Sequence, residues 1–291
     1  MEFLYNLLGD FVKKIYPIFL SLLLVYFSFY YTNRVVDIIK SKDPIMLQIK
    51  SNKDKYEVDF TDAIIEENYI IPGKNGLKVN ENKSFQKMKK YGKYNESLLV
   101  FDEIEPDVSL NSYYDKYIES GRNDLKEVAL VFKVERFDTI DNVVDILSSN
   151  ETKATFFLDG LFVDNNYETI KSLKNKYELE LLSYNNGYEK AYFKSGLQSL
   201  YNITNIKPKY CYAEYDNKKV LTLCDNLGLH TIIPTINSNN SFKLIKERLT
   251  SGAIISLDVD DDNLSTIINY IKQRGYKFVT LDELLLESYE K

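Results

Sequence analysis

From about residue 128 to the end of the chain, short apolar runs alternate with helical patterns. One helical pattern places Ile140, Val143 and Leu147 at the spacing of a single buried helix face. The strand-like runs are 128–133, 154–158, 178–183, 208–212, 230–233, 253–257 and 277–280. Repeated strand–helix units imply a parallel sheet, and seven of them predict an α/β domain with a closed or nearly closed barrel.

The N-terminus carries an uncharged apolar segment, Ile15–Tyr31, with Lys13 and Lys14 before it and Arg34 after it. Its length is at the short end of a membrane span, and its tyrosines lie where an interfacial belt would be. A cleaved signal peptide is the alternative, but the segment ends in bulky aromatics instead of small residues. We therefore expect a membrane anchor helix at 15–31. A short tail ahead of a long soluble part favours a single-pass protein of the cell membrane with its C-terminal domain extracellular.

Between the anchor and the repeated units lies a region of mixed pattern. Strand-like runs at 46–50, 56–60, 68–73 and 97–104 surround one helical piece at 84–90. We therefore expect three parts: a tail and anchor at 1–34, a stalk and small accessory α/β region at 35–120, and the barrel domain at 121–291.

Four segments of the C-terminal part resemble a known family. They are VALVF at 128–132, ATFFLDG at 154–160, GAII at 252–255 and GYKFVTLDEL at 275–284. Their order and spacing are similar to those of the polysaccharide deacetylase domain, also called the NodB-homology domain or carbohydrate esterase family 4. The resemblance covers residues 121–291 and implies a distorted (β/α)7-type barrel with its site at the carboxyl ends of the strands.

The resemblance also implies a chemistry. Members of the family remove acetyl groups from N-acetylated sugars of cell-wall glycans. A divalent metal, often zinc, is held by an aspartate and two histidines and polarises the amide carbonyl, while an aspartate acts as base and a later histidine as acid.

The positions that match the family's base and first metal ligand are Lys133 and Val134. A lysine must lose its proton before it can bind a cation, and a valine has no donor atom. The positions that match the two histidine ligands are Leu182 and Asn186, with Ser183 retained. An amide oxygen is a weak ligand for a zinc-type site. No metal cofactor is therefore expected.

Two further family positions have also changed. The third motif keeps its tyrosine as Tyr212 but has lost the arginine that would orient the base, and the histidine that acts as acid corresponds to Asp258. The chain has one histidine, His230, which matches no family site position; we expect it to pack or hydrogen-bond at a strand end. No catalytic residue is therefore predicted.

Several polar side chains remain around the family's site position. They are Lys133, Glu135, Ser183, Asn186, Glu214, Tyr215 and Asp258. One interpretation is a groove in which Lys133 supplies the charge of the lost metal and pairs with Asp258 or Glu214; the other is a set of solvated rim charges. An acidic run at 258–263 lacks the glycine and distal glutamate of a calcium loop and is read as a solvated loop that ends in a helix cap.

Two cysteines, Cys211 and Cys224, have no histidine at metal-ligand spacing. They are interpreted as buried free thiols, with a disulfide as the alternative. The net charge of −6, without a concentrated lysine or arginine stripe, argues against a nucleic-acid partner.

Three hypotheses for function follow. The favoured one is a membrane-anchored pseudoenzyme that binds cell-wall glycan or another polysaccharide, or scaffolds envelope proteins. The second is an active carbohydrate deacetylase with a rearranged site built from Lys133, Glu135, Glu214 and Asp258. The third is a structural protein whose residues 45–120 bind a partner.

Overall fold

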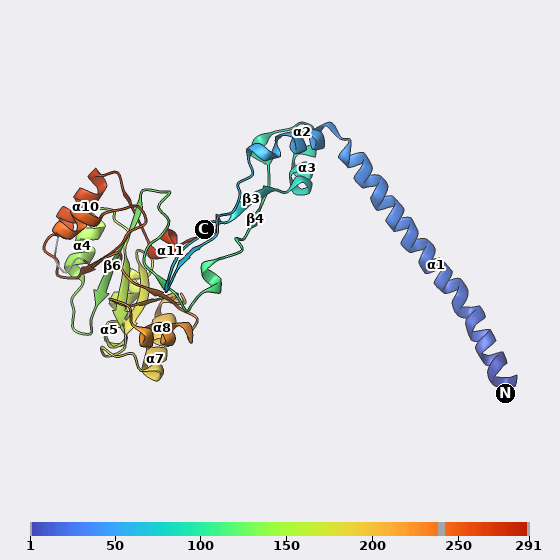
Figure 1. Cartoon of the computed structure of the whole chain (residues 1–291). Helices are drawn as coiled ribbons and strands as arrows, with labels where there is room; N and C mark the ends of the chain where they lie inside the picture. The colour runs from blue at the N-terminus through green and yellow to red at the C-terminus, as the bar shows by residue number, and fades with distance from the viewer. Residues whose placement is uncertain (1, 238–241, 290–291) are drawn as a thin grey trace. The chain divides into compact units, whose positions relative to one another are not determined.

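A computed structural model describes residues 2–237 and 242–289 (Figure 1). By its contacts the chain divides into two compact units. The smaller unit comprises Met1–Val58 and Leu77–Asp102, and the larger unit comprises Asp59–Gly76 and Glu103–Lys291. Residues 59–76 and 103–120, which the sequence analysis placed in an accessory region, therefore lie in the larger unit, because their strands pair there.

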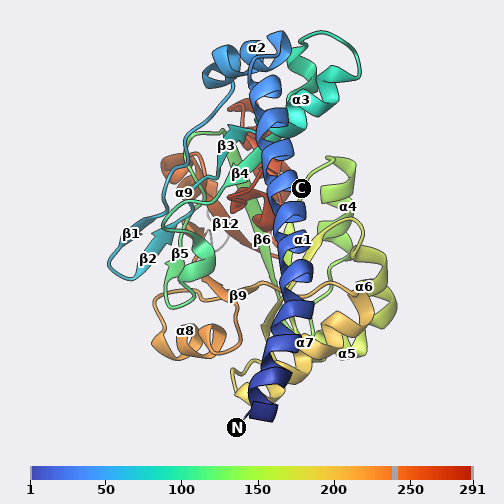
Figure 2. The same ribbon diagram turned by 90° about the vertical axis from the view of Figure 1, so that its right-hand side faces the viewer.

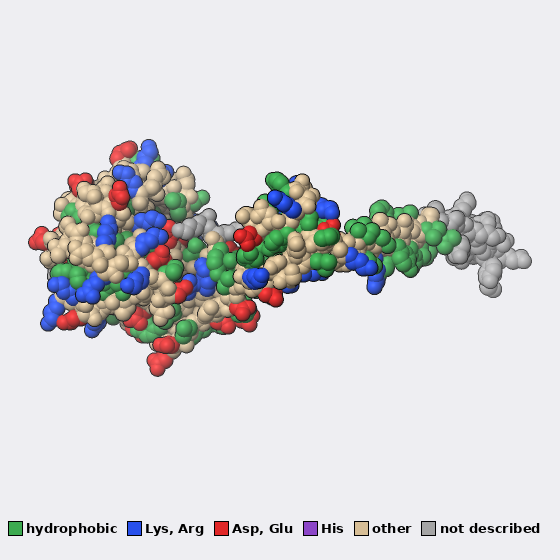
Figure 3. Space-filling view, turned by 90° about the horizontal axis from the view of Figure 1, so that it is seen from above, with side chains coloured by type: hydrophobic (Ala, Val, Ile, Leu, Met, Phe, Trp, Pro, Cys, Tyr) green, Lys and Arg blue, Asp and Glu red, His purple; other side chains and the backbone are tan. Residues whose placement is uncertain are grey.

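The smaller unit begins with one long helix, α1 (Glu2–Ser41). Within it, Phe19–Ser41 is long and apolar enough to cross a membrane, with a mean hydropathy of 1.2, and none of it is buried. Figure 3 shows hydrophobic side chains on the surface of the described part of this helix. This stretch overlaps the expected anchor at 15–31 and extends further toward the C-terminus.

The rest of the smaller unit packs two short helices, α2 (Pro44–Asn52) and α3 (Glu81–Lys89), around Ile49 and Met88, which are fully buried. The expected strand at 46–50 is wrong, because this segment is the middle of α2. Asp43 caps the helix by accepting a hydrogen bond from the backbone N of Ile45, and Pro44 occupies the first turn, where a proline is favourable.

Short elements complete this part of the chain. They are the 3-10 helices η1 (Lys53–Lys55) and η2 (Glu96–Leu98) and the paired strands β3 (Gly76–Val79) and β4 (Phe101–Ile104). The boundary between the two units falls within β3 and within β4. The strand expected at 56–60 is reduced to an isolated antiparallel bridge between Val58 and Leu77.

The larger unit contains a six-stranded parallel sheet, and β6 (Glu127–Val134) lies at its centre. Its order is β11 (Ile236–Asn237), β12 (Ile254–Asp258), β6, β7 (Thr155–Asp159) and β8 (Glu178–Ser183), and β13 (Lys277–Val279) pairs with the first residues of β6. The strands and the parallel pairing agree with the sequence prediction, apart from the short β11, which the sequence analysis did not identify.

Alternation along β6 separates two cores. Leu130, Phe132 and Val134 face a layer of helices, while Ala129 and Val131 face the second sheet. The helices that contribute to the first core are α4 (Asp141–Ser149), α5 (Gly160–Asn165), α6 (Tyr167–Leu173), α9 (Phe242–Arg248) and α10 (Leu264–Gln273). Figure 2 shows α4 and α6 on one side of β6.

The second sheet has five strands in the order β1 (Ile64–Glu66), β2 (Tyr69–Ile71), β5 (Tyr117–Ile118), β10 (His230–Ile232) and β9 (Tyr210–Tyr212). Only the β1–β2 pair is antiparallel. The remaining elements of the unit are η3 (Leu110–Ser112), α7 (Lys190–Thr204), α8 (Lys218–Asp225) and α11 (Leu281–Leu284).

The α/β class is confirmed, but apart from the β3–β4 pair the described strands form two sheets and not one closed ladder. Side chains bridge the seams between the sheets. At one seam the Glu180 carboxylate accepts hydrogen bonds from the backbone N of Lys209, at 2.8 Å, and of Tyr210, at 3.0 Å. At the other, the Thr235 hydroxyl donates to the carbonyl of Glu119 and accepts from the backbone N of Ile254. The seven-unit barrel stays a prediction.

Candidate functional site

The carboxyl ends of β6, β9 and β12 bring three charged side chains together, which we call the carboxyl-end site: Lys133, Glu214 and Asp258. Lys133 and Asp258 are direct neighbours in the β6–β12 register. The ammonium of Lys133 lies 3.4 Å from a carboxylate oxygen of Glu214 and 3.7 Å from one of Asp258. The Lys133 side chain is 22% exposed and the two acids are more exposed, so the pairs lie at the edge of solvent.

The surroundings of this cluster hold it in place. The amide of Asn237 donates to the same Glu214 oxygen at 3.0 Å, and the Lys133 ammonium lies 6.0 Å from the centre of the Tyr212 ring. The Tyr212 hydroxyl is hydrogen-bonded to Ser256 at 3.0 Å. Burial raises the pKa of Tyr212, so this phenol stays neutral. The cluster therefore holds one cation between two anions.

Beside the carboxyl-end site, the buried carboxylate of Asp159 organises the loop that follows β8. One of its oxygens accepts from the backbone N of Leu161 and of Asn185, at 2.9 and 3.1 Å. The other accepts from the Ser183 hydroxyl at 2.5 Å and from the backbone N of Asn186 at 3.0 Å. Asn185 and Asn186 both have left-handed backbone, which asparagine tolerates better than most residues. In this chain a carboxylate thus fixes the loop where the family would have its second histidine ligand.

The residues that match the family's metal ligands do not meet in the structure. Val134 is buried and faces the helix layer, on the opposite face of β6 from Lys133. Leu182 is buried in the core between the sheets, whereas Asn186 is exposed. Glu135 is exposed on the loop after β6. Among the described residues, no group of three or more histidine, cysteine, aspartate or glutamate side chains is placed to hold a metal ion.

Exposed aromatic side chains surround the same ends of the strands, and the sequence analysis identified only one of them. Tyr215 follows β9 and is 67% exposed, and Phe137 follows β6 and is 82% exposed. Tyr188 follows β8 and is 39% exposed. Aromatic residues in the loops that follow the predicted strands are the signal that could have identified Phe137 and Tyr188.

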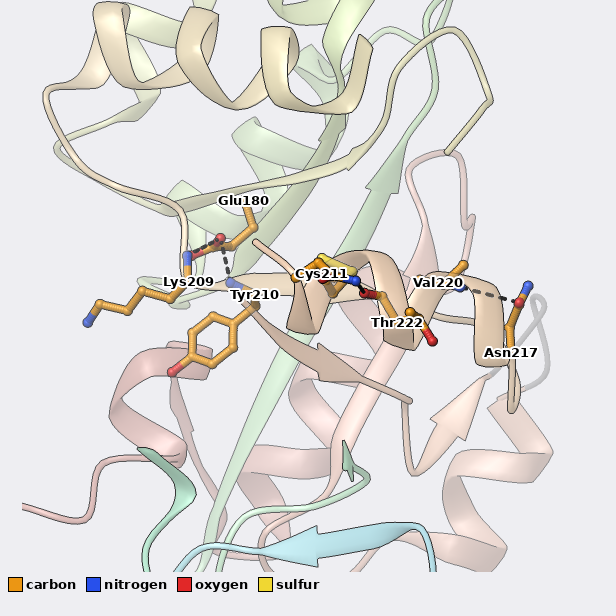
Figure 4. Close-up of a disulfide and its surroundings, with 9 residues drawn as sticks. Glu180, Lys209, Tyr210, Cys211, Asn217, Val220 and Thr222 are labelled. Atoms are coloured by element: carbon orange, nitrogen blue, oxygen red, sulfur yellow. Dashed lines mark hydrogen bonds between the residues drawn. A yellow bond between two sulfur atoms is a disulfide. The ribbon is translucent and has the colours of Figure 1, made fainter. Parts of the chain in front are cut away.

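Cys211 and Cys224 form a disulfide, so the interpretation as free thiols is wrong. Cys211 lies on β9 and Cys224 on α8, whose packing brings their Cα atoms to 6.2 Å, within reach of a disulfide (Figure 4). The acidic run also differs from expectation, because Asp261 is buried and its carboxylate accepts from the backbone N of Asn263. His230 starts β10, away from the carboxyl-end site, and lies at a strand end as expected.

Comparisons with known proteins identify the fold. No protein-family model matches the chain. Uncharacterized protein YlxY from Bacillus subtilis (strain 168) is 29% identical over 277 residues, which cover 87% of each chain. Among solved structures, wild-type BA3943, a CE4 family pseudoenzyme from Bacillus anthracis, superposes with a TM-score of 0.62 at 24% identity and covers 85% of this chain and 96% of its own.

Two further structures are similar. A BA3943 mutant described as a pseudoenzyme with restored enzymatic activity gives a TM-score of 0.63 at 24% identity, over 84% of this chain and 99% of its own. Bacillus subtilis PdaA, a family 4 carbohydrate esterase, gives 0.50 at 20% identity, over 60% of this chain and 86% of its own. The chain therefore has the NodB-like deacetylase fold that the sequence resemblance implied.

Proposed function

We propose that this chain is a membrane-anchored, deacetylase-like protein that binds cell-wall glycan at its carboxyl-end site without hydrolysing it. The observation that carries the proposal is the ion-pair cluster of Lys133 with Glu214 and Asp258. It lies at the strand ends where the fold would hold a metal and a base, and its charged side chains pair with one another.

The cluster opposes deacetylation for physical reasons. Hydrolysis of an amide in this fold requires a cation that polarises the carbonyl and a base that activates water. The Lys133 ammonium repels a divalent cation, and its neighbouring acids are engaged with it. The only imidazole of the chain, on His230, lies at the amino end of β10 and cannot donate a proton at the carboxyl ends. The alternative of a rearranged hydrolase would have to use Glu135, which is exposed on the loop after β6, or one of the two acids that pair with Lys133.

The exposed aromatic side chains around the site favour a sugar ligand. Phe137, Tyr188 and Tyr215 follow three different strands and leave large parts of their rings open to solvent. Aromatic rings with an apolar face and, for tyrosine, a polar edge suit the mixed surface of a pyranose. A glycan that lay across the strand ends would contact these rings and the charged cluster together.

The relatives support loss of catalysis on a retained fold. BA3943 is described as a CE4 family pseudoenzyme, and one mutant of it as having restored activity. The strands and helices that stabilise the fold are separate from the loops that carry catalytic residues, so a fold of this kind can be retained after catalysis is lost. We extend this to the present chain and propose that its two sheets form a distorted barrel without a catalytic metal.

We propose an extracellular position for the larger unit, with Phe19–Ser41 as the membrane anchor. The Cys211–Cys224 disulfide supports this position, because disulfides persist in oxidising compartments outside the cytoplasm. An envelope protein partner is compatible with the same arrangement, but no described contact favours residues 45–120 as a binding surface over the carboxyl-end site.

The proposal is tested by co-sedimentation of the full-length chain, in a detergent without a sugar headgroup, with insoluble N-acetylated cell-wall glycan. We expect the wild type to sediment with the glycan and the double variant Phe137→Ala, Tyr215→Ala to lose most of this binding. Tyr167→Ala is the matched control, because Tyr167 is 50% exposed on α6, which packs on the helix side of the sheet. Equal sedimentation of all three proteins, or none by the wild type, would contradict the proposal.

A further inference from the structure

A cavity of about 540 Å³ opens in the larger unit at the amino ends of β9 and β10. It is therefore built at the end of the strands opposite the carboxyl-end site. One part of its wall comes from residues 105–114, which precede the region that resembles the deacetylases, and another from residues 282–288. Its volume is within the range of small-molecule sites.

Aromatic rings form one wall of this cavity. The rings of Tyr114 and His230 are stacked, with centroids 4.2 Å apart and planes inclined by 13°. Tyr210 adds a third ring, 6.4 Å from that of His230. Figure 4 shows the side chains of Tyr210 and Lys209 extending from the start of β9 away from the disulfide. Tyr114 is half-buried, so part of its ring is open to the solvent.

The imidazole of His230 is neutral and incompletely satisfied. The side chain is buried, and burial lowers its pKa to about 4. Its Nδ1 atom has no hydrogen-bond partner within the described part of the chain. An unsatisfied polar atom in a cavity wall is uncommon and is usually completed by water or a ligand. The wall thus offers an aromatic ring stack, within which the unpaired Nδ1 atom of His230 is buried.

Charged and polar groups also line the cavity, and some of them are paired within the protein. Lys209 and Asp282 form a two-point ion pair at 2.7 and 2.8 Å, and the Tyr210 hydroxyl donates to the same acid at 3.2 Å. Glu287 accepts from the Ser109 hydroxyl at 2.6 Å and from the backbone N of Leu110. Since Glu105 and Lys207 also line the cavity, it presents carboxylate, ammonium and hydroxyl groups together, a mixture that suits a ligand with many hydroxyl or amide groups.

From this wall chemistry we propose that the cavity is a second saccharide site, which takes an uncharged N-acetylated sugar unit against the Tyr114–His230 stack. The choice of sugar as the ligand rests on the proposed glycan-binding function, whereas the site itself is separate from the carboxyl-end site. With one site at each end of the strands, the larger unit can hold two glycan segments at once.

The chain offers a direct reporter for this cavity, because His230 is its only histidine. The test is NMR of the full-length chain, with isotope-labelled histidine, in detergent micelles without sugar headgroups. A tetramer of N-acetylglucosamine is titrated in. We expect the single imidazole signal to shift and saturate. Tyr114→Ala should weaken the apparent affinity at this signal about fivefold, as loss of one aromatic contact does, while Tyr215→Ala should leave it unchanged.

The outcomes separate the two proposals. If the tetramer binds and Tyr215→Ala abolishes all binding while the imidazole signal never moves, the cavity proposal is overturned and the carboxyl-end site stands. If the tetramer does not bind at all, both fail. Should Tyr114→Ala not fold, Asn111→Leu obstructs the same cavity from an exposed position and is expected to weaken the shift in the same way. An undiminished shift in that variant would also overturn the proposal.

Discussion

Replacing Asp159 by asparagine tests whether a buried carboxylate holds the loop after β8. In the native chain its two oxygens accept four hydrogen bonds, from the backbone N of Leu161, Asn185 and Asn186 and from the Ser183 hydroxyl. An asparagine has one acceptor oxygen and one NH2 group, so it cannot serve all of these donors.

The cost follows from that geometry. If the NH2 group replaces the oxygen that faces Ser183, the serine hydroxyl rotates and accepts from it, but the backbone N of Asn186 is left facing a donor. One unsatisfied donor costs about 1–3 kcal/mol, and the remaining bonds lose their charge assistance. We therefore expect Asp159→Asn to lower the free energy of unfolding of the larger unit by about 3 kcal/mol.

The assay is urea denaturation of the full-length chain, followed by circular dichroism and by tyrosine fluorescence, since the chain has no tryptophan. The matched control is Asp164→Asn. Asp164 accepts a single hydrogen bond, from the Tyr184 hydroxyl at an exposed position, and its loss should cost less than about 1 kcal/mol. The reasoning is refuted if Asp159→Asn destabilises the chain no more than this control does.

Three further changes have defined outcomes. Burial raises the pKa of Glu178 to about 7 in the folded chain. Glu178 then binds more protons in the native state than in the unfolded state between about pH 4.5 and 7, so its contribution to stability falls by about 2–3 kcal/mol as the pH rises through that window. Compared with the wild type in urea denaturation at pH 5 and 8, Glu178→Gln should therefore lose less stability or gain more as the pH rises, and equal pH dependence of the two proteins would contradict this. Joint replacement of Cys211 and Cys224 by alanine should lower stability by about 3 kcal/mol, because the disulfide closes a loop with a sequence separation of 13; a melting temperature equal to that of the wild type would exclude this. Lys133→Met should cost less than about 1 kcal/mol, since its ion pairs are partly exposed, and a thermal melt that shows a larger loss would mean that the cluster supports the fold.

The elements that the sequence predicted well are those whose pattern repeats locally. The run at 178–183 is β8 to the residue, and of the predicted helix face Val143 and Leu147 lie within α4 and Ile140 at its N-cap. By contrast, the apolar run at 46–50 is too short to distinguish a strand from a helix by periodicity. In the structure it belongs to α2, whose N-terminus Asp43 caps. The strands β2 and β5 joined the larger unit through pairing between segments far apart in the chain, which no local pattern reveals.

The candidate site was predictable only in part for a similar reason. The family resemblance aligned Lys133, Glu214 and Asp258 with positions around the family's site, and in the structure both acids lie within ion-pair distance of Lys133. The role of Asp159 was missed, because three of the four donors that it binds come from residues 183–186, a segment remote from it in the sequence. Val134 points toward the helices because side chains alternate between the two faces of β6, and the match of this position to a family motif does not reveal that face.

The central claim is that the carboxyl-end site binds a glycan without hydrolysing it, and acetate release tests this most directly. The full-length chain is incubated with a tetramer of N-acetylglucosamine in the presence of zinc, with an active family 4 esterase as the positive control. We predict that the chain releases no acetate above the protein-free blank while the control does. Acetate release by the chain that is lost in Lys133→Met or in a Glu214→Gln, Asp258→Asn double variant would contradict the account.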